Sequence, residues 1–206
     1  MQGIKLDLSA RHLALVEACI SGHIKIVELL LDSGASINRI TYTKEEGSCN
    51  QGMCNNCAYS LELGYLAGPN ALMAACRYGR IELVKLLLVR GADVKQYLPW
   101  KEEEDNGVGK TAIHFACELY HWDIVKLLIA HGASTNCVYN TPSPMMYACR
   151  QGNVEMYELL YTTSDADTPV EEVDDFLQSC LSYAAARGHM DMLQTVLQDC
   201  KVCGLY

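Results

Sequence analysis

The sequence lacks any long apolar segment and is short of positive charge. No run of about 18 apolar residues is present, and no N-terminal stretch resembles a signal peptide. Lys and Arg number 16 against 25 Asp and Glu, giving a net charge of −9. Nucleic acids and anionic membranes are polyanions, so both are disfavoured as partners. The acidity mildly favours a partner protein or peptide with a basic segment, although solubility alone also explains it.

The sequence also lacks a recognisable set of catalytic residues. No Ser-His-Asp or Cys-His combination is defined by spacing. Residues 107–111 (Gly-Val-Gly-Lys-Thr) resemble the end of a phosphate-binding loop. However, position 104 is Glu where the first glycine is required, and no strand is expected before it. We therefore expect no enzymatic activity and no cofactor.

Cysteine, in contrast, is abundant, with 11 residues. Small secreted domains place cysteines in loops as a disulfide framework. Here five of them lie in Ala-rich stretches with helical patterning, where free cysteine behaves as a small buried hydrophobe. This pattern predicts reduced thiols and a cytoplasmic or nuclear location. The five are Cys19, Cys76, Cys117, Cys149 and Cys180.

One 19-residue pattern recurs five times along the chain. Its shared alanine falls at positions 18, 75, 116, 148 and 184, with spacings of 57, 41, 32 and 36 residues. Internal repetition of this kind is the signature of a repeat protein. The five segments are 13–31, 70–88, 111–129, 143–161 and 179–197.

Each segment has the pattern of two short helices. In the second segment, small residues at 74–76 allow close helix approach, and Gly79 supplies a turn. Leu83, Val84, Leu87 and Leu88 then form one apolar stripe. A single helix pair has too little surface to bury this stripe, so the pairs are expected to stack side by side.

These segments resemble ankyrin repeats. Residues 111–116 (Thr-Ala-Ile-His-Phe-Ala) match the family's Thr-Pro-Leu-His-x-Ala signature, and residues 34–38 and 132–136 match its Gly-Ala-x-x-Asn ending. The resemblance implies an all-α solenoid of about five helix-turn-helix repeats that binds a protein or peptide. It also implies that His114 is a structural group bonded to the backbone. Tyr120 departs from the family pattern because it replaces the turn glycine of the third repeat.

The spacings place two long finger loops within a single domain covering residues 1–206. Apolar residues near both ends, Leu6, Leu8 and Leu205, suggest a segment of a longer protein, because terminal repeats need polar outer faces. The inserts cover about residues 39–66 and 96–109. The repeats are predicted at about residues 10–38, 68–95, 109–136, 141–163 and 177–200.

The second insert carries the best candidates for binding a partner. Aromatic side chains on a loop are typical interface anchors, and neighbouring acids favour a basic partner. A second aromatic group lies at the turn of the third repeat. In each place packing is the competing interpretation, with Trp100 folding back onto a finger or Trp122 packing between helices. The predicted partner-binding residues are Tyr97, Trp100, Glu102, Glu103, Glu104, Asp105, Tyr120 and Trp122.

The first insert contains Cys49, Cys54 and Cys57 in a C-x4-C-x2-C spacing, and Cys200 and Cys203 lie near the other end. Four thiolates are a common structural zinc site. The two groups are expected tens of Å apart, since each packed helix layer adds about 8–10 Å. We therefore expect no metal.

The most consistent hypothesis is a monomeric interaction module that binds a partner through its finger loops and concave face. One alternative is a substrate-receptor or targeting arm of a larger enzyme. A weaker alternative is a metal- or redox-sensing module that uses the loop cysteines.

Overall fold

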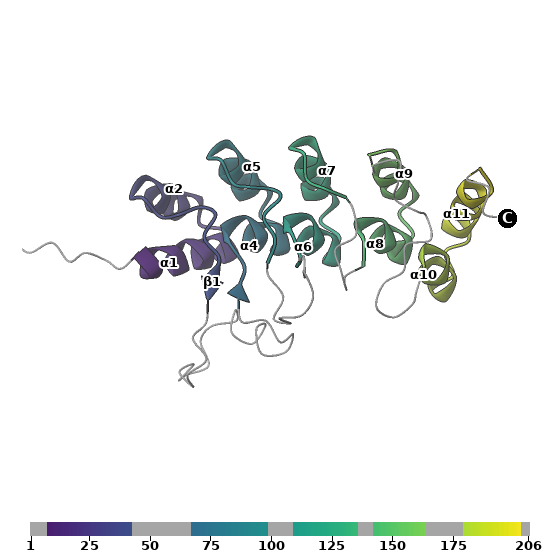
Figure 1. Cartoon of the computed structure of the whole chain (residues 1–206), viewed down its shortest axis with the longest axis horizontal. Helices are drawn as coiled ribbons and strands as arrows, with labels where there is room; N and C mark the ends of the chain where they lie inside the picture. Colours follow the sequence, from purple (N-terminus) through teal and green to yellow (C-terminus); the bar gives the residue numbers. More distant parts are fainter. Residues whose placement is uncertain (1–7, 43–66, 99–108, 136–141, 164–178, 203–206) are drawn as a thin grey trace, which may run out of the picture.

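A computed structural model describes residues 8–42, 67–98, 109–135, 142–163 and 179–202. Within these ranges five helix pairs stand side by side in two layers, with the first and the fifth pair at opposite ends of the row (Figure 1). The predicted all-α ankyrin-type solenoid is confirmed. The pairs are α1 (Leu8–Ser21) with α2 (Ile24–Asp32), α4 (Ala71–Arg77) with α5 (Ile81–Val89), α6 (Ala112–Glu118) with α7 (Trp122–Ala130), α8 (Pro144–Gln151) with α9 (Val154–Thr163), and α10 (Cys180–Arg187) with α11 (Met190–Val202).

The first helices of the second and fourth pairs start at a polar cap. Asn70 Oδ1 accepts a hydrogen bond from the backbone N–H of Met73 at 2.9 Å, and Ser143 Oγ accepts one from Met146 at 3.3 Å. Pro144 follows as the first helical residue, where its missing N–H costs nothing. The caps therefore fix where α4 and α8 begin.

The turn between the two helices requires a left-handed residue. Gly79, Gly152 and Gly188 adopt φ values of 66°, 76° and 71°. Tyr120 adopts φ 59° at the same position in the third pair, so the turn is kept without glycine. This conformation costs a non-glycine residue about 1–2 kcal/mol, which the surrounding packing must offset.

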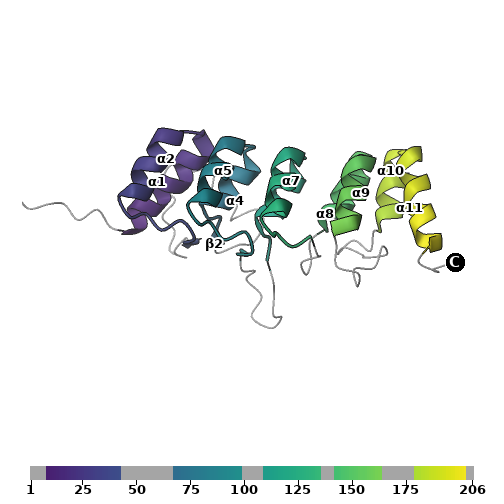
Figure 2. The ribbon, with the colours of Figure 1, turned by 90° about the horizontal axis from the view of Figure 1, so that it is seen from above.

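The core runs through the whole stack. In α4, Ala74, Ala75 and Cys76 are each at most 1% exposed, because α1 and α6 pack on its two sides. Small side chains at these positions let the first-helix layer pack closely, as the row of helices in Figure 2 shows. The outer layer adds larger side chains such as Leu87 and Leu128, which are fully buried.

The contacts between the first and second, second and third, and fourth and fifth pairs share a recurring hydrogen bond. The residue after the turn reaches back to a carbonyl near the end of the preceding pair's first helix. Arg80 Nε donates to Ile20 O at 3.1 Å, and His121 Nε2 lies 3.1 Å from Arg77 O. In the last pair, His189 Nε2 lies 3.2 Å from Arg150 O. This bond sets the spacing of the pairs on the turn side.

Two short strands lie at the base of the first finger. β1 (Thr41–Tyr42) pairs antiparallel with β2 (Ala67–Gly68). The pairing brings Thr41 opposite Gly68 and closes the base of the long insert between the first two helix pairs.

Candidate functional site

The second finger is held firmly where it leaves the solenoid. Tyr97 forms a β-bridge with Thr111, and the Leu98 N–H donates to Lys110 O at 2.8 Å. Leu98 is buried at 3% exposure, whereas the Tyr97 side chain remains 46% exposed. The base of the insert is therefore fixed with an aromatic side chain on its surface. The predicted residues Trp100, Glu102, Glu103, Glu104 and Asp105 lie outside the described residues.

A chain of amide side chains ties successive finger bases together. Asn38 Oδ1 accepts from the Asp93 N–H at 2.9 Å, and Gln96 Nε2 donates to Asn38 O at 2.7 Å. Asn70 Nδ2 donates to Gln96 Oε1 at 2.8 Å while its own oxygen caps α4. These bonds tie the segments around Asn38, Asn70 and residues 91–96 to one another at the bases of the fingers.

A cluster of charges lies between the first helices of the second and third pairs. Glu118 accepts from Arg77 Nη1 at 3.3 Å and from Lys110 Nζ. Arg77 also stands over the Phe115 ring, with Cζ 5.9 Å from the ring centre. The side chains of Arg77, Lys110 and Glu118 are only 11–18% exposed. Arg77 and Glu118 occupy the same repeat position, two residues before the turn residue, but nothing in the sequence pattern reveals that they pair.

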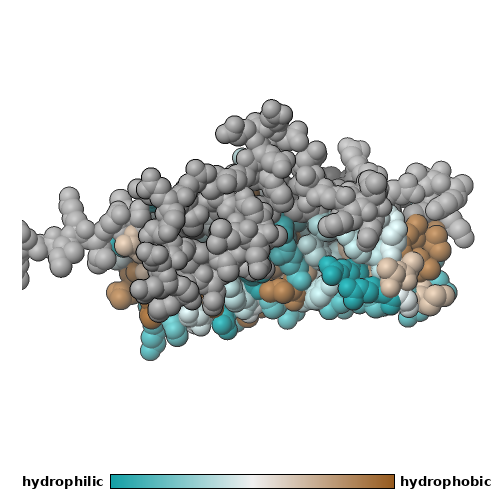
Figure 3. All heavy atoms as spheres, turned by 90° about the horizontal axis from the view of Figure 1, so that it is seen from below, coloured by the Kyte–Doolittle hydropathy of each residue, from teal (hydrophilic) through white to brown (hydrophobic). Residues whose placement is uncertain are grey.

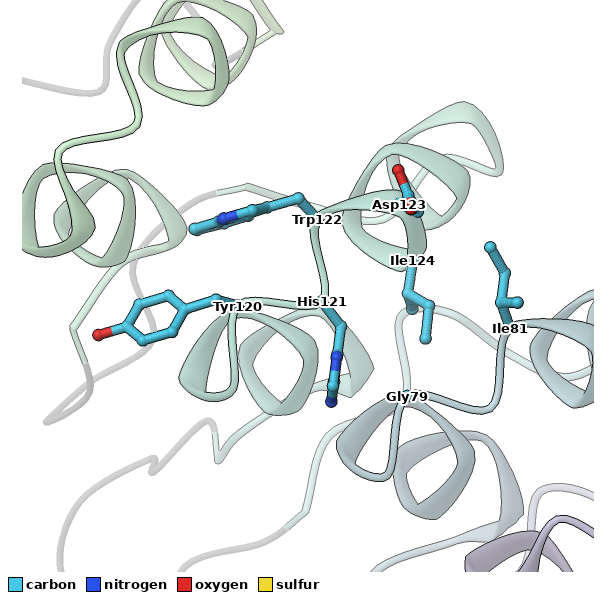
Figure 4. Close-up of a pocket in the computed structure, with 7 residues that line it drawn as sticks. All are labelled: Gly79, Ile81, Tyr120, His121, Trp122, Asp123 and Ile124. Atoms are coloured by element: carbon cyan, nitrogen blue, oxygen red, sulfur yellow. The ribbon is translucent and has the colours of Figure 1, made fainter.

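The second predicted aromatic group lies on the turn edge of the solenoid. The Tyr120 and Trp122 rings stand 5.9 Å apart, and Trp122 Nε1 donates to Gln151 Oε1 of the fourth pair. Both rings are half-buried and extend away from Ile81 (Figure 4). A shallow pocket of about 370 Å³ lies at this turn, and its lining includes Ile81, His121 and Ile124 as well as Tyr120 and Trp122.

The structure separates these two aromatic groups. Tyr97 is paired with Thr111 at the start of α6, and Tyr120 follows the end of that helix. At 1.5 Å per helical residue, the nine steps between Thr111 and Tyr120 correspond to about 13 Å. Tyr97 and the Tyr120–Trp122 pair therefore belong to opposite edges of the stack, and a single short contact cannot include both.

His114 is a structural group, as the resemblance implied. Its Nδ1 accepts from the Thr111 N–H at 3.4 Å and lies 2.9 Å from Thr111 Oγ1. Burial, with the nearby Lys110 charge, lowers the pKa of His114 from 6.5 to about 3. The imidazole is therefore neutral at pH 7, and its hydrogen bonds with Thr111 cap the start of α6.

The buried thiols are poor ligands and poor nucleophiles. Burial raises the pKa of Cys19 to about 12 and raises the pKa values of Cys76 and Cys117 further. A thiol must ionise to bind zinc or to attack, so these groups stay protonated. Among the residues that the structure describes, no group of three His, Cys, Asp or Glu side chains is arranged to hold a metal. Cys49, Cys54 and Cys57 lie outside those residues.

No helix in the described ranges is long and apolar enough to cross a membrane. In the described ranges the geometry defines a stack of helix pairs, which is the architecture of a helical-repeat protein.

The comparisons with known proteins identify the family. "Ankyrin repeats (3 copies)" matches residues 44–137 and 72–172, and "Ankyrin repeat" matches residues 10–42. The chain belongs to the ankyrin-repeat family. Repeats of this family generally mediate protein–protein interaction and are generally not catalytic.

Relatives include larger proteins of several kinds. The chain is 28% identical over 193 residues to the "Ankyrin repeat and KH domain-containing protein mask-1" of Caenorhabditis elegans, covering 89% of this chain and 7% of the relative. It is 26% identical over 180 residues to the "E3 ubiquitin-protein ligase XBAT33" of Arabidopsis thaliana, covering 87% and 28% respectively. Against the human "SH3 and multiple ankyrin repeat domains protein 2" it is 30% identical over 102 residues, 48% of this chain and 5% of the relative. The chain thus spans under a third of the length of these relatives.

Proposed function

We propose that this chain is a non-catalytic binding module that holds a partner protein or peptide through its second finger and the adjacent face of the first-helix layer. The observation that carries the proposal is the fixed base of that finger, with Leu98 buried and Tyr97 exposed beside it. A preorganised base lowers the entropy lost when a loop binds. The predicted anchor, Trp100, is only two residues beyond this base.

The chemistry of the finger favours a basic segment in the partner. Glu102, Glu103, Glu104 and Asp105 follow Trp100 directly in the sequence. Four adjacent acids create a negative potential that attracts Lys or Arg and repels acidic competitors. We propose that the aromatic residues mainly slow dissociation of the partner and that the acids mainly speed its association.

Substitution of Trp100 should separate these two contributions. With a partner captured from lysate and identified by mass spectrometry, Trp100→Ala should weaken binding by about 2 kcal/mol, mainly through faster dissociation. Replacing the four acids by Gln and Asn should instead slow association and flatten its salt dependence. Surface-based kinetics at two ionic strengths measures both effects.

The matched control is Met190→Ala, which truncates an exposed apolar side chain at the start of α11 in the last helix pair. It should bind as the wild type does. If Trp100→Ala folds normally and also binds as the wild type does, the finger is not the anchor. The Tyr120–Trp122 edge would then be tested in the same way.

A second candidate function is a targeting arm of a larger enzyme. Relatives named E3 ubiquitin-protein ligases match 87% of this chain in Arabidopsis thaliana and in Oryza sativa. Under this hypothesis the captured partner would be modified by the associated enzyme. Ubiquitylation of the partner in lysate that depends on Trp100 would support the arm, and binding without modification would favour a scaffold.

We also propose a reducing compartment, the cytoplasm or the nucleus. Cys19, Cys76, Cys117, Cys149 and Cys180 are free and buried. We expect these five thiols to resist alkylation until the chain unfolds, since burial blocks access to all of them and raises the pKa values of Cys19, Cys76 and Cys117. Mass spectrometry after labelling, with and without denaturant, measures this. Rapid labelling of the five in the folded chain would contradict their burial, and disulfides among them in cells would contradict the compartment.

A further inference from the structure

The two layers of helices carry opposite charge. The second helices of the five pairs contain eight acidic residues and four lysines. The first helices contain four arginines and only two glutamates. The first helices, which form the lower layer in Figure 1, are therefore net positive, although the chain as a whole carries a charge of −9.

Two arginines of this layer are exposed and lack an acidic neighbour among the described residues. Arg150 lies on α8 and Arg187 on α10, and neither forms an ion pair within the described ranges. Glu118, the acid on α6, is already bonded to both Arg77 and Lys110. Figure 3, seen from below, shows hydrophilic side chains gathered at the lower edge of this layer, in the half of the row that holds the fourth and fifth pairs.

Aromatic rings accompany these arginines on the first helices. Phe115, Tyr147 and Tyr183 occupy one repeat position, five residues before the turn residue of the third, fourth and fifth pairs. Arg77 shows how the two kinds of side chain combine, because its guanidinium group stands over the Phe115 ring. Burial raises the pKa of the Tyr147 hydroxyl and the Arg150 charge lowers it, so Arg150 lies near that ring.

The ends of the helices do not by themselves account for this arrangement. Cations are favourable near the C-terminal end of a helix, and Arg77, Arg150 and Arg187 all lie in the last turns of their helices. However, α6 ends on Glu118, whose charge is compensated by the two cations beside it. Beside Arg150 and Arg187, the described part of the chain supplies no acid within ion-pair distance.

The chemistry of this surface favours carboxylates. Arg, Tyr and Phe are enriched in protein interfaces, and a guanidinium group binds a carboxylate through two parallel hydrogen bonds. Since α8 and α10 contact each other directly, their axes lie about 8–10 Å apart. An extended chain advances about 3.3 Å per residue, so acids two or three positions apart would reach both arginines.

We propose that the first helices of the fourth and fifth pairs form a second docking surface, where Arg150 and Arg187 bind a short acidic segment of a partner protein in extended conformation. The surface is separate from the second finger, which joins the second and third pairs. The segment is short because a long polyanion would be repelled by the net charge of −9.

A peptide probe tests this surface before any partner is known. The probe is a fluorescein-labelled peptide with Glu at every third position and Ser and Tyr between, and its counterpart carries Gln in place of Glu. In anisotropy titrations at low ionic strength, the wild type should bind the Glu peptide about tenfold more tightly, and added salt should reduce this preference. Arg150→Gln combined with Arg187→Gln should abolish most of it without changing the melting temperature, since both side chains are exposed.

The matched control is Lys85→Gln combined with Arg90→Gln. It removes the same net charge from exposed sites on α5 and at its C-terminal cap, and it should keep the preference for the Glu peptide. The probe contains no basic residue, so the result does not depend on the acids of the second finger.

Three results would overturn the proposal. Equal affinity for the Glu and Gln peptides excludes recognition of carboxylates. A preference that survives the two Arg substitutions places the acid-binding site elsewhere, and an equal loss in the control shows that only net charge matters. Residues 165–175 contain six acids of this chain. If the Glu peptide binds only after these are replaced by Asn and Gln, the chain's own acidic stretch occupies the surface in place of a partner.

Discussion

Gly79→Ala should destabilise the chain by about 2–4 kcal/mol, and Gly91→Ala by only about 1 kcal/mol. Both glycines have positive φ, 66° and 87°, so both substitutions introduce backbone strain. They differ in their surroundings. A Cβ on Gly79 would lie 2.7 Å from His121 Cε1, whereas a Cβ on Gly91 would meet nothing within 4 Å.

The His121 ring cannot move away freely, because its Nε2 lies 3.1 Å from Arg77 O in the contact between the second and third pairs. Chemical denaturation of the two variants beside the wild type measures the difference. Equal losses for both variants would show that strain alone matters and that the His121 contact is compliant. A His121→Ala background should remove most of the difference between them.

The free energy of unfolding should fall as the pH drops from about 6.5 towards 4, with a slope of up to about 1.4 kcal/mol per pH unit from His114 alone. The pKa of His114 is about 3 in the folded chain and 6.5 in the unfolded chain. Between these two pH values the unfolded chain binds a proton at His114 and the folded chain does not. His12 acts in the same direction, because burial also lowers its pKa. The stability contributed by the neutral rings is complete above pH 6.5 and is lost as the pH falls.

Denaturation at several pH values, wild type beside His114→Gln, measures this slope. The variant should be less stable at pH 7 and should show a shallower decline below pH 6.5. NMR titration of the imidazole provides a second measurement, and the His114 signals should not change down to pH 4. A normal titration near pH 6.5 in the folded chain would show that the ring is accessible to water.

The sequence by itself determined the repeat, the helix pairs and the family. These features depend on short-range patterns: small residues at 74–76, a turn glycine at Gly79, and an apolar stripe through α5. The structural role of His114 was also predictable, because its partner Thr111 is three residues away in the same signature. Local contacts of this kind have the same meaning wherever the repeat occurs.

Only the tertiary structure decided how distant residues combine into surfaces. Glu118 meets Arg77 across 41 positions, and Gln96 meets Asn38 across 58, because stacking brings the helix pairs together. Stacking also places Tyr97 and Tyr120 at opposite edges, so the two predicted aromatic groups belong to separate surfaces. Similarly, Leu83 and Ile124 occupy the same repeat position and are both buried, because the neighbouring helix pair packs beside them.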